Sequence, residues 1–139
     1  MRPVSLLLLA LAVSAYSGAA RADPCEAPVN RYQPGDQFSG QVRYIGDGDS
    51  LCVGASADPR QWIEVRLADF DAPELSEPNG PRGKAMLRTL AAGKPARCTA
   101  VAGRNGRTVS YDRVIAVCRI EGRSLGDLLR ARGAPQGGR

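Results

Sequence analysis

The order of short alternating runs along the chain is the feature that most restricts its fold. From Phe38 to Tyr44, apolar and polar residues alternate with a period of two, which is typical of a strand with one buried face. Similar runs follow, and two segments carry helical patterns instead. The expected strands cover residues 38–44, 51–53, 61–67, 96–101 and 113–120, and the expected helices cover 81–92 and 124–133. This order, in a chain of 139 residues, indicates a small, mainly β barrel.

The strand count predicts a five-stranded OB-fold barrel with two short helices, a fold whose open face commonly binds oligonucleotides or sugars. The first helix has Pro81 in its first turn and Gly93 just after its end, where these residues are favoured. The barrel domain is expected to span residues 37–134. An N-terminal arm (23–36) precedes it and a flexible tail (135–139) follows it.

The first 22 residues have the pattern of a secretory signal peptide. Arg2 supplies a positive charge, residues 4–13 are apolar apart from one serine, and Ala20-Arg21-Ala22 is a small-x-small cleavage site. The apolar run is shorter than the roughly 20 residues that span a bilayer. We therefore expect cleavage after Ala22 and export to the periplasm or the medium, with no membrane segment in the mature chain. An uncleaved N-terminal anchor is the alternative.

Four cysteines lie beyond this leader: Cys25, Cys52, Cys98 and Cys118. An even number in an exported chain indicates two disulfides, with three possible connectivities. Cys98 and Cys118 lie in two expected strands joined by one loop, so they can face each other across an antiparallel pair. That pairing leaves Cys25 to join Cys52. A zinc site is the alternative, but the chain has no C-x-x-C pair and no histidine.

The absence of histidine restricts the chemistry of the chain. Because the usual proton shuttle and the commonest imidazole metal ligand are missing, any catalysis has to come from carboxylates, arginines, water and a metal ion. The formal net charge of +5 at pH 7 fits a polyanionic partner but does not require one.

Two acidic segments are candidates for such a site. Asp47-Gly48-Asp49-Ser50 follows one expected strand and Asp71-Ala72-Pro73-Glu74 follows another, with Arg66 on the strand that leads to it. Both segments can meet at one end of the sheet, where packed carboxylates repel one another unless a cation lies between them. All-oxygen ligands suit Ca²⁺ or Mg²⁺, and a guanidinium beside the ion suits a phosphate. The alternative is two ordinary turns and a surface ion pair.

Over roughly residues 38–134, the chain resembles the staphylococcal nuclease (thermonuclease) family of secreted OB-fold phosphodiesterases. The matching stretches are Ile45–Leu51, Val65–Glu74, Tyr111–Ala116 and Leu125–Ala134. The chain departs from the family at Asp112, which replaces a glycine. The given sequence continues for only six residues after Gly133, so we expect no counterpart of the family's last helix or of an aromatic residue that stacks on substrate.

The resemblance implies a metal site and a catalytic carboxylate. Asp49 and Asp71 look like direct Ca²⁺ ligands, with the backbone carbonyl of Ala72 as a third and Asp47 in a supporting position. Glu74 looks like the carboxylate that holds or deprotonates the attacking water. Ca²⁺ is expected in preference to Mg²⁺.

The resemblance also implies a phosphate site. Arg66 and Arg113 look like the two phosphate-binding arginines, and Arg107 competes with Arg113 for the second position. Tyr111 looks like a hydrogen-bond donor to a terminal phosphate. In this family pattern the 5′ oxygen leaves and the products carry 3′-phosphates.

The expected function is that of an exported, calcium-dependent nuclease that hydrolyses phosphodiester bonds in DNA and RNA with low sequence specificity. It is expected to act as a monomer on single-stranded or frayed nucleic acid. One alternative is a non-catalytic OB-fold module that binds nucleic acid. The other is an interaction domain of the cell envelope that is stapled by disulfides.

Overall fold

The computed structural model describes residues 23–137. The expected signal peptide (1–22) and residues 138–139 of the expected tail lie outside the described residues, so cleavage after Ala22 stays a prediction. Within the described range, no helix is both long and apolar enough to cross a membrane.

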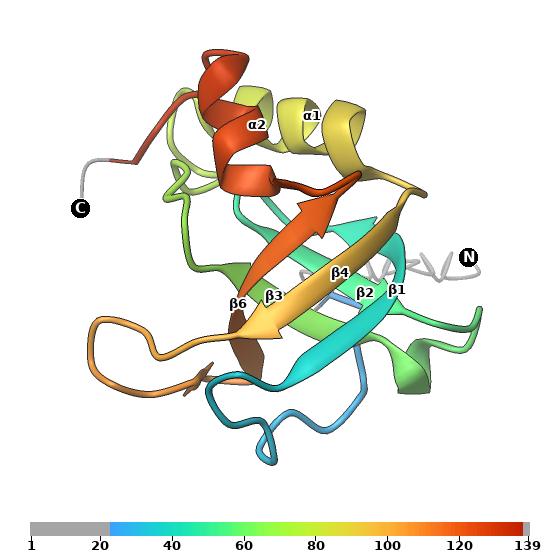
Figure 1. Cartoon of the computed structure of the whole chain (residues 1–139). Helices are drawn as coiled ribbons and strands as arrows, with labels where there is room; N and C mark the ends of the chain where they lie inside the picture. The colour runs from blue at the N-terminus through green and yellow to red at the C-terminus, as the bar shows by residue number, and fades with distance from the viewer. Residues whose placement is uncertain (1–22, 138–139) are drawn as a thin grey trace, which may run out of the picture.

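Five strands form a closed barrel, which confirms the predicted fold class (Figure 1). Their order is β3-β2-β1-β4-β6, and a pairing between β3 and β6 closes the sheet. The barrel strands are β1 (Gln37–Ile45), β2 (Ser50–Gly54), β3 (Ile63–Leu67), β4 (Pro95–Ala100) and β6 (Arg113–Ile120). The helices are α1 (Gly80–Ala91) and α2 (Leu125–Ala131), and the minor elements are η1 (Pro59–Gln61), β5 (Val109–Ser110) and β7 (Arg123–Ser124).

The parallel pairing of β3 with β6 decides which residues face outward near the barrel's closure. Val65 lies opposite Val114 and Leu67 lies opposite Ala116, and all four side chains are buried in the core. Because successive side chains of a strand point to opposite faces, the residues between them lie on the outer face. Arg66 and Arg113 are therefore delivered to the same outer surface by neighbouring strands.

The two helices pack against each other over one end of the barrel (Figure 1). Leu87 of α1 and Leu129 of α2 are completely buried in the common core. Helix α2 begins where the sequence predicts, because the Ser124 hydroxyl accepts a hydrogen bond from the Asp127 N–H at 3.1 Å. The helices thus cover one end of the barrel with apolar side chains.

Strand β3 begins at Ile63, two residues later than the sequence predicts. The Asp58 carboxylate accepts a hydrogen bond from the Arg60 N–H and caps the short helix η1, which takes up Gln61. The Trp62 indole N–H then donates to the Ser56 carbonyl at 2.8 Å. Local side-chain hydrogen bonds therefore override the alternating pattern at these two positions.

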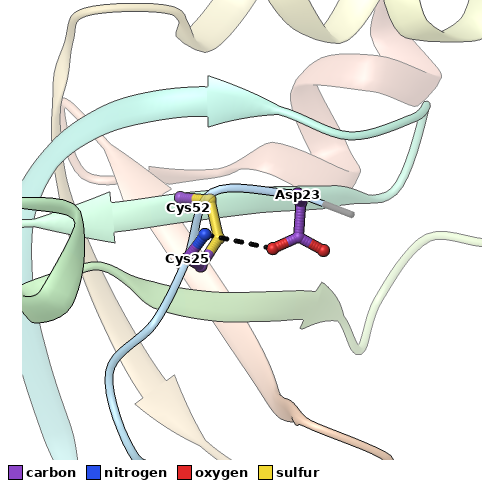
Figure 2. Close-up of side chains that lie close together, drawn as sticks. All are labelled: Asp23, Cys25 and Cys52. Atoms are coloured by element: carbon purple, nitrogen blue, oxygen red, sulfur yellow. Dashed lines mark hydrogen bonds between the residues drawn. A yellow bond between two sulfur atoms is a disulfide. The ribbon is translucent and has the colours of Figure 1, made fainter. Parts of the chain in front are cut away.

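Both predicted disulfides are present. Cys98 and Cys118 are directly opposite each other in the antiparallel pair of β4 and β6. Cys25 of the arm is bonded to Cys52 of β2 (Figure 2). Asp23 lies beside the second bridge and accepts a hydrogen bond from the Cys25 N–H at 3.1 Å. Both sulfurs of that bridge are bonded to each other, so they cannot serve as thiolate metal ligands.

The arm is part of the folded domain. Val29 and Tyr32 are buried in the core cluster. The N–H groups of Glu26 and Ala27 donate to the carbonyls of Pro59 and Trp62, each at 3.0 Å. The arm therefore covers the segment that leads into β3. The alternating sequence pattern alone would leave the outer face of this strand open to solvent.

Candidate metal and phosphate site

The first acidic segment is a tight turn between β1 and β2. The Asp47 carboxylate accepts hydrogen bonds from the Asp49 N–H at 3.0 Å and from the Ser50 hydroxyl at 2.8 Å. Such a side-chain hydrogen bond to the backbone two residues on is typical of an Asx turn. Burial acts to raise the pKa of Asp47, but the hydrogen bonds from Asp49 and Ser50 and the charge of Arg113 outweigh it and lower the pKa.

Gly48 allows the two acidic segments to approach each other. A Cβ atom at this position would lie 2.5 Å from the Cβ atom of Ala72, which is closer than real side chains come. The absence of a side chain therefore permits the first turn to pack directly against the second segment. This contact explains why glycine stands between Asp47 and Asp49.

Asp49 lies at the centre of this contact and is only 5% exposed. Its Oδ2 accepts a hydrogen bond from the Ala72 N–H at 2.8 Å and lies 3.1 Å from Nη2 of Arg66. Burial raises the pKa of Asp49 to about 7, and the charge of Asp47 acts in the same direction. The Ala72 hydrogen bond and the Arg66 charge only partly oppose this rise.

Asp71 is more open, with 34% of its side chain exposed. Its Oδ1 accepts from Nη2 of Arg66 at 2.6 Å, and its Oδ2 accepts from Nη2 of Arg104 at 2.7 Å. The hydrogen bond from Arg66, together with the charges of both arginines, holds the pKa of Asp71 below its usual value. Asp71 is therefore ionised at neutral pH.

Arg66 joins the two carboxylates. Its Nη2 contacts both Asp49 and Asp71, and its Nη1 donates to the carbonyls of Leu67 and Phe70. The hydrogen bonds from Nη1 to the backbone fix the guanidinium plane, so Nη2 lies between the carboxylates of Asp49 and Asp71. The structure thus brings together Asp49, Asp71 and Arg66, three of the four residues that the sequence predicts to converge; Glu74 is the fourth. Their roles as ligands and phosphate clamp stay predictions.

A cleft of about 340 Å³ opens beside this cluster. Arg66, Asp71 and Arg113 line it, together with Tyr111 and Arg104. Both predicted phosphate-binding arginines and the predicted tyrosine therefore share one cavity. Arg107, the competing candidate for the second arginine, lies outside this lining.

Tyr111 is held in an unusual conformation. Its φ angle is 59°, in the left-handed region that favours glycine, and its side chain is 92% exposed. Tyr111 and Asp112 form the two-residue connection between β5 and β6, and a turn of this kind commonly has glycine first. Asp112 does not have a positive φ, so an aspartate rather than a glycine at this position does not strain the backbone. The strain lies instead at the exposed tyrosine.

Glu74 lies on the exposed loop between Asp71 and α1, and it is not among the residues that line the cleft. Its N–H donates to Oε1 of Glu77 at 2.9 Å. The structure therefore places Glu74 near the cluster in sequence, three residues beyond Asp71, but not in the cavity with the arginines. Ala72 is buried, and its N–H rather than its carbonyl is the group that contacts Asp49.

The end of the described chain runs along the same segment. The Gly137 N–H donates to the Asp71 carbonyl at 2.8 Å, and a Cβ atom on Gly137 would lie 2.8 Å from the Ala72 carbonyl oxygen. Gly137, in the expected tail, therefore lies against the backbone of the candidate ligands Asp71 and Ala72.

Sequence reasoning missed two charged residues. Arg104 is separated by 33 residues from its partner Asp71 and lies in a polar loop that has no motif. Glu64 alternates with core residues, a pattern that places it on the outer face of the strand, yet it is only 8% exposed. Its burial, its hydrogen bond with Asp23 and the charges of Asp23 and Asp112 raise its pKa to about 8, and within residues 23–137 its Oε2 has no hydrogen-bond partner.

No protein-family model matches the chain. Among curated proteins, the chain is similar to a micrococcal nuclease from Shigella flexneri, with 45% identity over 53 residues. The match covers 38% of this chain and 29% of that nuclease, so this chain spans less than a third of the relative's length. The likeness supports a nuclease-like relationship over the matched segment.

Proposed function

We propose that the protein is an exported nuclease that uses Ca²⁺ to hydrolyse phosphodiester bonds in DNA and RNA with low sequence specificity. The observation that carries this proposal is the position of Arg66, which contacts Asp49 and Asp71 at once and lines a cleft with Arg113 and Tyr111. Two carboxylates thus contact one arginine that shares a cleft with a second, which supports a cation site beside a phosphate site. The partial likeness to a micrococcal nuclease supports the same class of reaction.

The chemistry of the donor set fits Ca²⁺. Asp49 and Asp71 offer carboxylate oxygens and Ala72 offers a backbone carbonyl, and Ca²⁺ prefers such oxygen ligands. Arg66 now supplies the positive charge between the two carboxylates. A bound cation would neutralise them instead, which would leave the guanidinium available for a phosphate. Mg²⁺ requires a near-ideal octahedron and is less favoured.

The residues of the chain supply the remaining chemistry. Arg66 and Arg113 would hold the scissile phosphate and neutralise the charge that builds on it, Tyr111 would donate to a terminal phosphate, and Ca²⁺ would polarise a phosphoryl oxygen. Glu74 would take a proton from the attacking water as the new P–O bond forms. The bond to the 5′ oxygen then breaks, a proton from solvent completes the 5′-hydroxyl, and the other product keeps a 3′-phosphate. This role requires the exposed loop that carries Glu74 to approach the cleft.

Export is supported by the two disulfides, because such bonds persist in oxidising compartments. The proposal places the mature N-terminus at Asp23, after cleavage at Ala22, and the protein in the periplasm or the medium. N-terminal sequencing of the secreted or periplasmic protein tests this directly; an N-terminus at Met1 in a membrane fraction would contradict it.

The activity is tested with the purified, oxidised protein and end-labelled single-stranded DNA, with Ca²⁺, Mg²⁺ or chelator. We expect Ca²⁺-dependent products with 3′-phosphate ends, and a rate loss of at least about 100-fold in Arg66→Ala and in Glu74→Gln. Arg82→Ala, on the exposed face of α1, is the matched arginine control, and Glu26→Gln in the arm is the matched glutamate control.

The three candidate functions give different results in this assay. Cleavage that stops with chelator supports the nuclease. Retardation of the DNA without cleavage supports the non-catalytic binding module, and neither effect supports the envelope interaction domain. Full cleavage by Arg66→Ala would overturn the assignment of this site.

A further inference from the structure

A second, larger groove lies on the outer face of β1, β4 and β6. Its volume is about 720 Å³, and three arginines line it: Arg43, Arg97 and Arg119. We call it the arginine groove. Its other lining residues are mostly small or uncharged: Ser39, Gly40, Gln41, Ala55, Pro95, Ala96 and Gly122, with Glu121 the one acidic member. The groove is therefore open, cationic and wide enough for more than a single phosphate.

The arginines of the groove are poorly neutralised. Arg97 and Arg119 are direct partners in the antiparallel pair of β4 and β6, and like charges directly opposite each other destabilise a sheet. Among the described residues, none of the three arginines forms an ion pair with a carboxylate. Arg43 donates through Nε to the Gly54 carbonyl at 3.1 Å, which fixes the guanidinium at the groove wall. A bound polyanion would offset the repulsion between these charges.

Strand β6 connects this groove to the cleft of the candidate site. Arg113 lines the cleft and Arg119 lines the groove, and the burial of β6 alternates regularly between them. Residues an even number of positions apart lie on the same face of a strand, so both arginines point outward, roughly 20 Å apart at about 3.3 Å per residue. Single strands occupy about 4–16 nucleotides per OB fold, so one strand can reach both positions.

We propose that the arginine groove binds the sugar-phosphate backbone of single-stranded nucleic acid that extends beyond the catalytic cleft. This inference rests on the proposed nuclease function for the identity of the polyanion. The planar, bidentate guanidinium suits phosphate oxygens, and contacts of this kind carry no base preference. The groove would therefore raise the affinity for long strands without changing the chemistry at the cleft.

The test is fluorescence anisotropy in chelator, where cleavage is prevented, with labelled oligothymidylates of about 20 and about 4 nucleotides. The variant is Arg97→Gln with Arg119→Gln. The control is Arg82→Gln with Arg132→Gln, which removes the same charge from a different surface depression beside α1 and α2. Arg97→Lys with Arg119→Lys retains the charge, and thermal unfolding verifies that each variant folds.

For the long oligonucleotide, we expect the groove variant to lose at least 5-fold in affinity. Its salt dependence, measured between about 50 and 200 mM salt, should become shallower by about 1.4, because each lost phosphate contact on a single strand removes about 0.7. With the long oligonucleotide, the control variant and the lysine variant should show the same salt slope as the wild-type protein. With the short oligonucleotide, the groove variant should also show the same slope as the wild type. Equal losses of affinity in the groove and control variants would overturn the proposal. It would also be overturned if the groove variant lost more affinity for a heparin fragment of matched charge than for the oligonucleotide.

The two proposals fail separately. The groove variant should still cleave the short oligonucleotide with Ca²⁺ at the wild-type rate. If the wild-type protein cleaves no substrate but its salt slope exceeds that of the groove variant, the proposed nuclease function is overturned and the proposed binding by the arginine groove is supported. If the wild-type protein cleaves DNA but has the same salt slope as the groove variant, the nuclease function is supported and binding by the arginine groove is overturned.

Discussion

Asp49 and Asp71 contact the same guanidinium nitrogen, yet their pKa values move in opposite directions. The pKa of Asp49 rises to about 7 and that of Asp71 falls below its usual value. The difference lies in solvation, because Asp49 is almost completely buried beneath Ala72 whereas Asp71 is partly exposed and has a second arginine. One ion pair is not enough to keep a buried carboxylate charged, so the buried half of the site needs a further cation more than the open half does.

Replacing each carboxylate by its amide should reveal the largest difference between the buried Asp49 and the partly exposed Asp71. Asp49→Asn and Asp71→Asn should each lower Ca²⁺-dependent cleavage by at least about 100-fold if both are ligands. In chelator at pH 8, Asp49→Asn removes a buried charge and should raise the free energy of unfolding by about 1 kcal/mol, whereas Asp71→Asn should lower it by up to about 1 kcal/mol. Initial rates and urea titrations measure both quantities.

A loss of several kcal/mol in Asp49→Asn at pH 8 would show that the ionised Asp49 stabilises the metal-free fold. That result would remove the contrast between the two carboxylates. Asp36→Asn, at an exposed position in the arm, is the control for a general effect of charge.

The second test is the pH dependence of unfolding without metal. Between pH 4 and 7 folded Asp49 keeps its proton and the unfolded chain releases it near 3.8, so the folded state binds more protons. Stability should therefore fall as pH rises through this window, by on the order of a few kcal/mol. Glu64, with its pKa raised to about 8, acts in the same direction at slightly higher pH. Urea titrations across pH measure the slope.

If Asp49 is a Ca²⁺ ligand, calcium should oppose this trend, because binding requires the ionised carboxylate. At about 100 times its Kd, a ligand adds about 2.7 kcal/mol, and we expect most of this gain at pH 8 and little at pH 5. The slope between pH 5 and 7 should flatten in Asp49→Asn. A metal-free stability that increases from pH 5 to 7 would contradict the assignment of the raised pKa.

The third test concerns the exposed side of the site. Tyr111→Gly should relieve the positive φ and raise the free energy of unfolding by about 1 kcal/mol, while it weakens the binding of single-stranded DNA by about 10-fold if the ring stacks on a base. Tyr111→Phe keeps the ring and the strain but removes the hydroxyl, so it isolates the predicted donor to phosphate. Unchanged affinity in both variants would show that Tyr111 does not touch the substrate.

The sequence was sufficient for the fold and for the contact between Asp49 and Arg66. Alternation gave the barrel strands because one face of each is packed in the core, and the turn residues Asp47 and Gly48 specify where β1 and β2 meet. The convergence of Asp49 with Arg66 follows from strand pairing, since Ser50 and Arg66 are partners in the β2–β3 register. The Cys98–Cys118 bridge follows from the same kind of register, and it leaves Cys25 of the arm to pair with Cys52.

The open half could not be derived in this way. Arg104 reaches Asp71 from a loop whose path depends on tertiary packing. Alternation places Glu64 outside the barrel but does not show that the arm covers it. The positive φ of Tyr111 follows from a two-residue connection whose length the alternating pattern leaves undefined. The path of a distant segment therefore decides the ion pair of Arg104 and the burial of Glu64, and the length of a local connection decides the φ angle of Tyr111.

The smallest expected effect is that of Arg104→Gln, and it tests whether the second arginine accounts for the contrast between the carboxylates. The side chain of Arg104 is 80% exposed, and exposed ion pairs contribute about 0–1 kcal/mol, so the free energy of unfolding should change by less than about 0.5 kcal/mol. Because Arg104 is one of the groups that lower the pKa of Asp71, that pKa should rise slightly, as NMR titration of the carboxyl carbon can show. Arg107→Gln, in the same loop, has no ion pair with Asp71 and should leave this pKa unchanged. An equal rise in both variants would mean that the loop's general positive charge, rather than the Arg104 contact, keeps Asp71 ionised.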